Sequence, residues 1–177
     1  MQFDTHLDTA DTYAGERISD CTQILRIAEM DCVKPSNIVQ IGIHGWLNPK
    51  EEVENSKRLG INVFTMSDCE RIGWMNVIER AIEISTTGTD ALYVTVDIDV
   101  LDPAYGPGTS ATEPGGLNSK QLYVALRRIA EIGISAFDLT CVAPQYDSSG
   151  ITERAAVTCI LELLAGISIF RYKSTNQ

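Results

Sequence analysis

Acidic and histidine side chains gather in two short segments of the chain, and their spacing suits metal binding. The segments are Asp4-x-His6-x-Asp8 and Asp97-x-Asp99-x-x-Asp102-Pro103. In a β-strand, residues i, i+2 and i+4 share one face, so the side chains of each segment could converge on one point. Carboxylates joined by one imidazole suit hard or borderline divalent ions such as Mn²⁺.

Grouping these carboxylates carries an electrostatic cost that a bound cation would remove. Like charges within about 4–6 Å raise carboxylate pKa values and destabilise a site. The alternative is that the second segment is only a strand end followed by an Asp-Pro turn. Either segment alone leaves the two interpretations balanced, whereas both in one chain favour a metal. The predicted ligands are Asp4, His6, Asp8, Asp97 and Asp99.

The elements that would position these side chains alternate along the chain. Apolar, β-branched runs predict strands at 38–43, 61–64, 91–97 and 134–139. Helical periodicity predicts helices at 22–30, 50–59, 74–86, 118–132 and 151–165, the fourth with Asn118 as its N-cap. This alternation predicts an α/β fold, a three-layer αβα arrangement around a mainly parallel sheet. Both acidic segments would open at carboxyl ends of strands, where such sheets place ligands.

Composition argues against several classes of protein. The 177 residues carry a net charge of −10 with scattered basic residues, so the electrostatic footprint of a nucleic-acid-binding protein is missing. No apolar run approaches the roughly 20 residues that span a bilayer, and the start lacks the pattern of a secretory signal. The five cysteines lack Cys-x-x-Cys spacing, which fits reduced thiols. We expect a cytoplasmic protein without membrane or nucleic-acid partners.

Several segments, taken together, resemble the ureohydrolase family of agmatinase and arginase. FDTHLD (3–8) is similar to the family's Asp-Ala-His-x-Asp motif, and VDIDVLDPAYGPGT (96–109) to its Asp-x-Asp-x-x-Asp-Pro motif. Further segments that look like agmatinase-like members are IVQIGIHG (38–45), EPGGL (113–117) and VAPQYD (142–147).

The resemblance runs from Phe3 to about Ala165. The first metal motif normally follows a strand, yet only Met1 and Gln2 precede it, too few for a central strand of about five residues. We therefore expect a single ureohydrolase-like domain over 1–177 that represents the carboxy-terminal half of an arginase-like fold, with its amino-terminal part missing.

The resemblance implies a chemistry and a role for each ligand. Two Mn²⁺ ions would share one hydroxide that attacks the guanidinium carbon of a small linear guanidino compound such as agmatine, releasing urea and an amine, as in polyamine metabolism. Asp4 and Asp97 would bridge both ions, Asp8 would hold one, and His6 and Asp99 the other. The family usually forms trimers or hexamers, which implies a homo-oligomer.

The chain departs from the family at three places that matter for catalysis. The family's first histidine ligand lies upstream of anything present here. Asp20 stands where a histidine transfers protons, and a carboxylate with a pKa near 4 is a poor shuttle at neutral pH. Cys141 stands where a glutamate binds the guanidinium, and a neutral thiol cannot form that bidentate salt bridge. These departures predict impaired activity.

His44 has two interpretations. It follows a strand and could replace the missing proton shuttle, or it could be a structural histidine in the turn before Trp46. The leading hypothesis is an agmatinase-like amidinohydrolase acting on linear amidines. The alternative is a non-catalytic homologue that acts as an assembly partner or weak metal binder, and a third is an α/β binding domain with coincidental acidic clusters.

Overall fold

The computed structural model describes residues 1–176 and contains one five-stranded sheet in the order β3-β2-β1-β4-β5. Every pair of neighbouring strands in this sheet is parallel. The strands are β1 (Gln2–Phe3), β2 (Val39–Ile43), β3 (Asn62–Thr65), β4 (Tyr93–Asp97) and β5 (Ala136–Thr140). The short β1 lies at the centre of the sheet, between β2 and β4.

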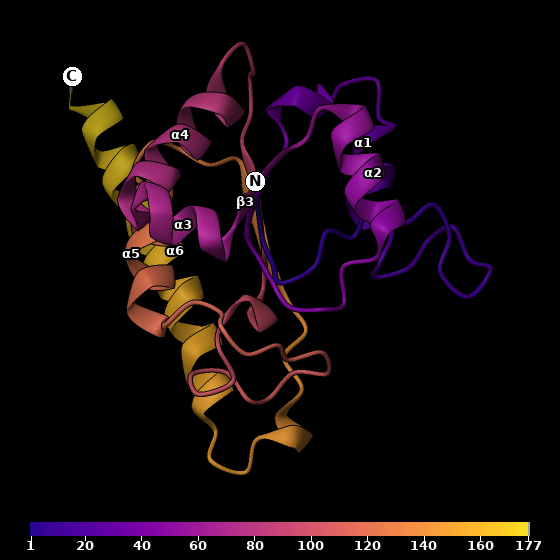
Figure 1. Cartoon of the computed structure of the whole chain (residues 1–177). Helices are drawn as coiled ribbons and strands as arrows, with labels where there is room; N and C mark the ends of the chain where they lie inside the picture. Colours follow the sequence, from indigo (N-terminus) through magenta and orange to yellow (C-terminus); the bar gives the residue numbers. More distant parts are fainter. Residues whose placement is uncertain (177) are drawn as a thin grey trace.

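Helices cover both faces of the sheet and make three layers (Figure 1). The helices are α1 (Gln23–Ala28), α2 (Lys50–Leu59), α3 (Met66–Ile72), α4 (Trp74–Thr86), α5 (Ser119–Ala130) and α6 (Ile151–Thr175). Helices α1 and α2 lie on one face, and α3 to α6 lie on the other (Figure 1). Short 3₁₀ turns occupy Pro35–Asn37, Ile98–Val100 and Pro144–Tyr146.

The main core lies between the sheet and the layer of α3 to α6. Phe3, Ile41 and Val96 of the three central strands point into it and are fully buried. The opposite face of the same strands carries buried polar side chains instead. There Gln40 donates from Nε2 to Gln2 Oε1 at 2.6 Å. The central strands therefore have an apolar face that stabilises the fold and a polar face that leads toward the acidic segments.

The fold class predicted from the sequence is confirmed, and each predicted strand and helix has a counterpart. Asn118 caps α5, accepting from the Gln121 N–H at 2.8 Å. Helix α3 was not predicted, and α6 continues ten residues past the predicted end at 165. The extension is possible because Gly166 lets α6 approach α5: a Cβ there would lie 2.4 Å from Ala130 Cβ.

Helix α6 also bears on the expectation that no segment could span a membrane. Over its best window its mean hydropathy is 1.6, so by length and composition alone it could cross a bilayer. A core helix of a soluble protein can have the same properties, and α6 packs against α5. The absence of a membrane partner stays a prediction.

Candidate metal centre

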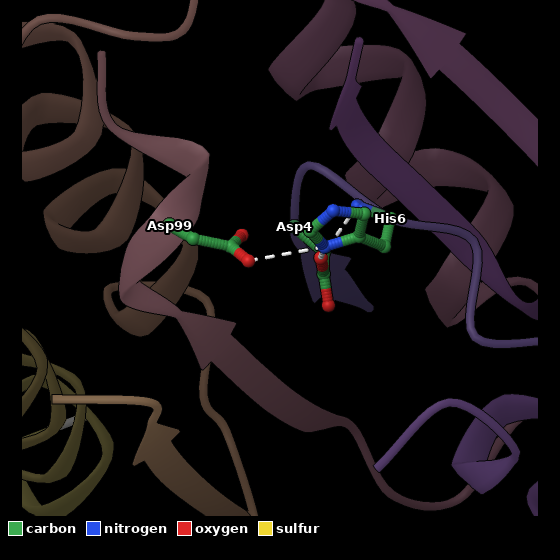
Figure 2. Close-up of side chains that lie close together, drawn as sticks. All are labelled: Asp4, His6 and Asp99. Atoms are coloured by element: carbon green, nitrogen blue, oxygen red, sulfur yellow. Dashed lines mark hydrogen bonds and ion pairs between the residues drawn. The ribbon is translucent and has the colours of Figure 1, made fainter. Parts of the chain in front are cut away.

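The two acidic segments leave the sheet side by side because β1 and β4 are neighbouring parallel strands. Figure 2 shows Asp4 and His6, which follow β1, facing Asp99 from the turn after β4. His6 Nδ1 lies 3.0 Å from Asp99 Oδ2 and 3.5 Å from Asp4 Oδ1. One ligand atom from each of the three residues lies within 4.8 Å of the others.

Backbone hydrogen bonds fix the orientation of this cluster. The Thr5 N–H donates to Asp99 Oδ1 at 3.1 Å, and the Thr5 hydroxyl donates to the Asp99 carbonyl at 2.7 Å. The His6 N–H donates to Asp4 Oδ1 at 2.6 Å. Two hydrogen bonds from Thr5 thus hold Asp99 against the first segment, and Asp99 Oδ2 stays directed at His6.

Hydrogen bonds connect Asp8 and Asp97 to the cluster, Asp8 through a shared partner and Asp97 directly. Gln2 Nε2 lies 2.6 Å from Asp4 Oδ2 and 3.4 Å from Asp8 Oδ2, so one amide links both carboxylates. Asp97 Oδ1 accepts from the Asp99 N–H at 2.9 Å, which caps the 3₁₀ turn. The Asp-Pro turn considered as the alternative for the second segment is also present, since the Tyr105 N–H donates to the Asp102 carbonyl at 2.7 Å, and it coexists with the convergence on His6.

Burial of these acids shifts their pKa values strongly. Burial raises the pKa of Asp4 well above its ordinary value, and the neighbouring carboxylates add to the rise. Burial, followed by the charge of Asp99, raises the pKa of Asp97 to about 7. Burial also raises the pKa of Asp8, although a hydrogen bond from Gln23 opposes this. Ionising all of these groups together therefore requires a compensating positive charge.

His6 supplies that charge when it is protonated. Burial lowers the pKa of His6, but the hydrogen bonds to Asp4 and Asp99 outweigh burial and raise it to about 11. Its Nε2 is buried and has no hydrogen-bond partner among residues 1–176. A divalent cation between the carboxylates would take over the compensation and leave His6 a neutral ligand. The donor set, oxygen-rich with one imidazole, fits such an ion.

The structure places His44 at the end of β2 with both ring nitrogens occupied by backbone carbonyls. Nδ1 lies 2.6 Å from the Gly42 oxygen, and Nε2 lies 3.0 Å from the Glu113 oxygen. A neutral imidazole has one N–H and can satisfy only one of these carbonyls at a time. In this arrangement the ring ties β2 to the 113–117 loop, which agrees with the structural interpretation of this residue.

Asp20 lies apart from the cluster. It is exposed, and Ser19 and Cys21 surround its carboxylate: the Ser19 hydroxyl donates at 2.5 Å and the Cys21 N–H at 3.0 Å. The hydrogen bond from Ser19 is the main cause that holds the pKa of Asp20 below its ordinary value. A proton shuttle at neutral pH would need the opposite shift.

Cys141, in contrast, lies beside the candidate metal centre. Its backbone adopts φ 65°, a left-handed conformation unusual for a side chain other than glycine. The residue is exposed, but partial burial of the thiol and then the nearby negative charge of Asp97 raise the pKa of the thiol. A thiol with a raised pKa stays protonated at neutral pH and is a poor nucleophile.

Sequence reasoning missed the residues that orient the acids. Besides Gln2 and Thr5, these are Gln23 of α1, which donates to Asp8 Oδ2 at 2.8 Å, and Thr140 of β5, whose hydroxyl lies 3.4 Å from Asp97 Oδ2. Amide and hydroxyl side chains have no characteristic spacing for this role. Only their place in the folded chain reveals it.

Comparison with known proteins agrees with this geometry. The profile of the arginase family matches residues 1–166. Agmatinase from Bacillus subtilis (strain 168) is 37% identical over 169 residues, which cover 94% of this chain and 54% of the relative. Proclavaminate amidinohydrolase from Streptomyces clavuligerus is 34% identical over 165 residues, which cover 93% of this chain and 52% of the relative.

Solved structures of related proteins have the same fold as this chain. Formimidoylglutamase from Bacillus subtilis superposes with a TM-score of 0.88 at 29% identity, over 94% of this chain and 52% of that one. The chain thus spans about half the length of the relatives it matches. The match over nearly its whole length, and the parallel sheet that carries the acidic segments, show that this chain belongs to the arginase family.

Proposed function

We propose that this chain is the metal-binding half of a manganese-dependent amidinohydrolase that acts on a linear guanidino compound such as agmatine. The observation that carries the proposal is the convergence of Asp4, His6 and Asp99 at the carboxyl ends of β1 and β4. Relatives named agmatinase and guanidinopropionase support a guanidino substrate, since their names describe hydrolysis of such compounds.

The ligand roles that we propose are those that the resemblance to the ureohydrolases implies. Asp4 and Asp97 would lie between two ions, Asp8 would hold one of them, and His6 and Asp99 the other. When bound, two dications would supply Lewis acidity and lower the pKa of water. The chain's own contribution is to hold these ligands in place: Gln2 and Gln23 orient the carboxylates of the first segment, and Thr5 orients Asp99.

The proposal includes weak catalysis by this chain. Asp20 is exposed and has a lowered pKa, so it does not replace a proton-transfer histidine. Cys141 reaches Asp97 but offers a neutral thiol, which cannot pair with a guanidinium ion. These two environments favour the second candidate, a non-catalytic homologue that binds metal weakly and acts in assembly.

The decisive experiment is titration of the purified chain with Mn²⁺. At about a hundredfold excess over the dissociation constant, a ligand that binds only the native state adds about 2.7 kcal/mol of stability. We expect Mn²⁺ to raise the melting temperature of the wild type and Asp99→Asn to remove the rise. Asn at this position still accepts the Thr5 N–H, so the fold is preserved.

Asp90→Asn is the matched control because Asp90 is exposed and precedes β4, at the opposite end of that strand from the second acidic segment. An equal Mn²⁺ response in wild type, Asp99→Asn and Asp90→Asn would reject the metal centre. Urea release from agmatine then separates the two candidates: metal binding without turnover, even after the upstream half of a relative is supplied, would favour the non-catalytic homologue.

A further inference from the structure

The first acidic segment continues past β1 alongside the end of β2. There the His44 N–H donates to the Thr5 carbonyl at 3.2 Å. In a parallel ladder, a residue whose N–H donates to the carbonyl of residue i−1 on the neighbouring strand also accepts from the N–H of residue i+1. With His6 as residue i, the regular pattern would join the Leu7 N–H directly to the His44 carbonyl.

The side-chain amide of Asn48 stands between these two groups instead. Its Nδ2 donates to the His44 carbonyl at 2.7 Å, and its Oδ1 accepts from the Leu7 N–H at 3.1 Å. Nδ2 also donates to the Thr5 carbonyl at 3.1 Å. A carbonyl only accepts and a backbone N–H only donates, so these partners allow one orientation of the amide. The inserted amide lets the chain leave β2 at His6 while both backbone groups stay paired.

The two groups of the first segment that Asn48 holds lie directly on either side of a proposed ligand. They are the Thr5 carbonyl and the Leu7 N–H, and His6 lies between them. At this point the His6 ring faces the second acidic segment, with Nδ1 3.0 Å from Asp99 Oδ2 (Figure 2). A shift of either backbone group would therefore move the imidazole relative to the carboxylates that it meets.

The next proposed ligand is held in a backbone conformation that side chains rarely adopt. Asp8 has φ 50°, in the left-handed region. Such a conformation persists where the surrounding structure fixes the backbone around it. Asn48 fixes the N–H that precedes Asp8. On the other side, Asn55 Nδ2 donates to the Thr9 carbonyl at 2.8 Å, and the Thr9 N–H donates to Glu52 Oε2 at 3.2 Å.

The position of Asn48 is itself restrained. Pro49 follows it, and a residue before proline is confined largely to extended backbone. Helix α2 then begins at Lys50. The side chain of Asn48 is half-buried. The amide thus comes from a short, stiff link between β2 and α2, which suits it to holding other groups in place.

We infer that Asn48 is a positioning residue for the proposed metal centre, whose amide joins the first acidic segment to β2 and sets where His6 and Asp8 present their ligand atoms. The inference rests on the proposed metal function and adds a residue outside both acidic segments. Among residues 1–176, Asn48 hydrogen-bonds to no side chain of a proposed ligand. It is also uncharged, so it would act through the backbone of the segment.

The test is calorimetric titration of Asn48→Ala with Mn²⁺, together with hydrogen exchange of the metal-free chain. Loss of a partner that orients metal ligands typically lowers affinity by about 10- to 100-fold. We expect Asn48→Ala to weaken Mn²⁺ binding at least about tenfold. The Leu7 amide should exchange faster in this variant than in the wild type, because its acceptor is gone.

Asn37→Ala is the matched control. Asn37 precedes β2 whereas Asn48 follows it, both are half-buried, and Asn37 Nδ2 also donates to two backbone carbonyls, those of Ile84 at 2.7 Å and Thr87 at 2.9 Å. Asn37→Ala should lower the melting temperature but leave Mn²⁺ affinity unchanged. A merely structural Asn48 would behave in the same way as Asn37.

Asn48→Asp is the second variant, and it decides the matter if Asn48→Ala does not fold. It keeps the size of the side chain and the acceptor for the Leu7 N–H, but it loses the donor to the Thr5 carbonyl. An added negative charge near the cluster would by itself strengthen cation binding. We nevertheless expect weaker Mn²⁺ binding than in the wild type, because the segment is displaced.

The outcomes separate this inference from the proposed function. Mn²⁺ binding by the wild type with equal affinity in Asn48→Ala, or with equal or higher affinity in Asn48→Asp, would overturn the inference alone. So would a Leu7 amide that exchanges equally fast in the wild type and Asn48→Ala. A wild type that does not bind Mn²⁺ would overturn the proposed function and this inference with it.

Discussion

The carboxyl ends of β1 and β4 differ from the loops around them in how their polar groups are used. In the centre, Asp4, His6 and Asp99 point toward one another, and burial holds the pKa of Asp4 high. In the loops, Asp20 and His44 are engaged by neighbouring hydroxyl and backbone groups. The centre keeps a buried nitrogen without a hydrogen-bond partner among the described residues, His6 Nε2, whereas Asp20 and His44 both have partners close by.

This difference supports the proposal that the chain has a metal site but lacks the residues that the family resemblance assigns to proton transfer and substrate binding. Clustered buried carboxylates are costly without a cation, so their presence argues for a retained metal site. The loop residues instead stabilise local structure. The metal-holding part of the site is therefore expected to work independently of the proton-transfer and substrate-binding parts, and the predictions below test that separation.

The largest expected effect concerns catalysis. Loss of a positioned acid or base, or of a partner that orients a ligand, plausibly costs about 10²-fold or more in each case. We expect the isolated chain to release little or no urea from agmatine with Mn²⁺ present. The double variant Asp20→His/Cys141→Glu should not rescue it alone. Fusion to the half of a relative that this chain does not match should first strengthen Mn²⁺ binding, and should give turnover only together with those two substitutions.

Brisk urea release by the unmodified chain would break the separation between centre and loops. It would assign a catalytic part to His44, despite the backbone carbonyls beside its ring, or to Cys141, despite the raised pKa of its thiol. The measurement is urea formation over time, with the Asp99→Asn variant as the background.

The next effect concerns the residues that orient the ligands. Gln23 donates to Asp8 Oδ2 at 2.8 Å from α1, outside the acidic segments. Removing such a supporting hydrogen bond typically lowers metal affinity by about 10- to 100-fold. We expect Gln23→Ala to weaken Mn²⁺ binding by about tenfold in calorimetric titration, while Gln145→Ala, an exposed glutamine in the loop before α6, leaves it unchanged. Equal Mn²⁺ affinities in the wild type, Gln23→Ala and Gln145→Ala would show that Gln23 does not support the site and would confine it to Asp4, His6 and Asp99.

Much of this centre could be predicted from the sequence because its proposed ligands fall into two short segments, each at the end of a predicted or neighbouring parallel strand. Asp4, His6 and Asp8 alternate over five residues, and the parallel order of β1 and β4 follows from the strand–helix alternation. Gln2 and Gln23 could not be predicted, since glutamine is compatible with many surroundings. The bond from His44 to Glu113 joins residues 69 positions apart, beyond any local pattern.

The fold shows the same contrast between local and distant causes. The signal for α3 was present in the sequence: Thr65 and Asp68 form a capping box directly at the end of β3. The length of α6 depends instead on Gly166 meeting Ala130 of another helix. Glycine in a helix normally lowers stability, so sequence alone favours an earlier end.

A smaller effect is expected at His44. If the ring only ties β2 to the 113–117 loop, His44→Ala should lower the free energy of unfolding by about 1 kcal/mol, within the usual range for a hydrogen bond. Mn²⁺ affinity should stay within about twofold of the wild type, since the loops are separate from the centre. Chemical denaturation and calorimetric titration check the two parts. Loss of metal binding without loss of stability would place His44 in the centre instead.

The smallest effect contrasts two buried aspartates with opposite pKa shifts. Asp147, at the start of α6, accepts hydrogen bonds from Ser149 and from the Thr152 N–H, and these hold its pKa well below its ordinary value, whereas the pKa of Asp97 is raised to about 7. Because the pKa of Asp147 is lowered in the folded state, its ionised carboxylate stabilises the fold above the unfolded-state pKa of about 3.9, and this stabilisation is lost as the pH falls below that value.

Asp147→Asn should therefore lower the melting temperature by a few degrees at pH 7, and the difference in melting temperature from the wild type should narrow below about pH 4. Because Asp147 lies outside the metal centre, the gap at pH 7 should be the same with and without Mn²⁺. A gap that widened on acidification, or that appeared only with Mn²⁺, would show that Asp147 belongs functionally with Asp97 and that centre and loops are not separate.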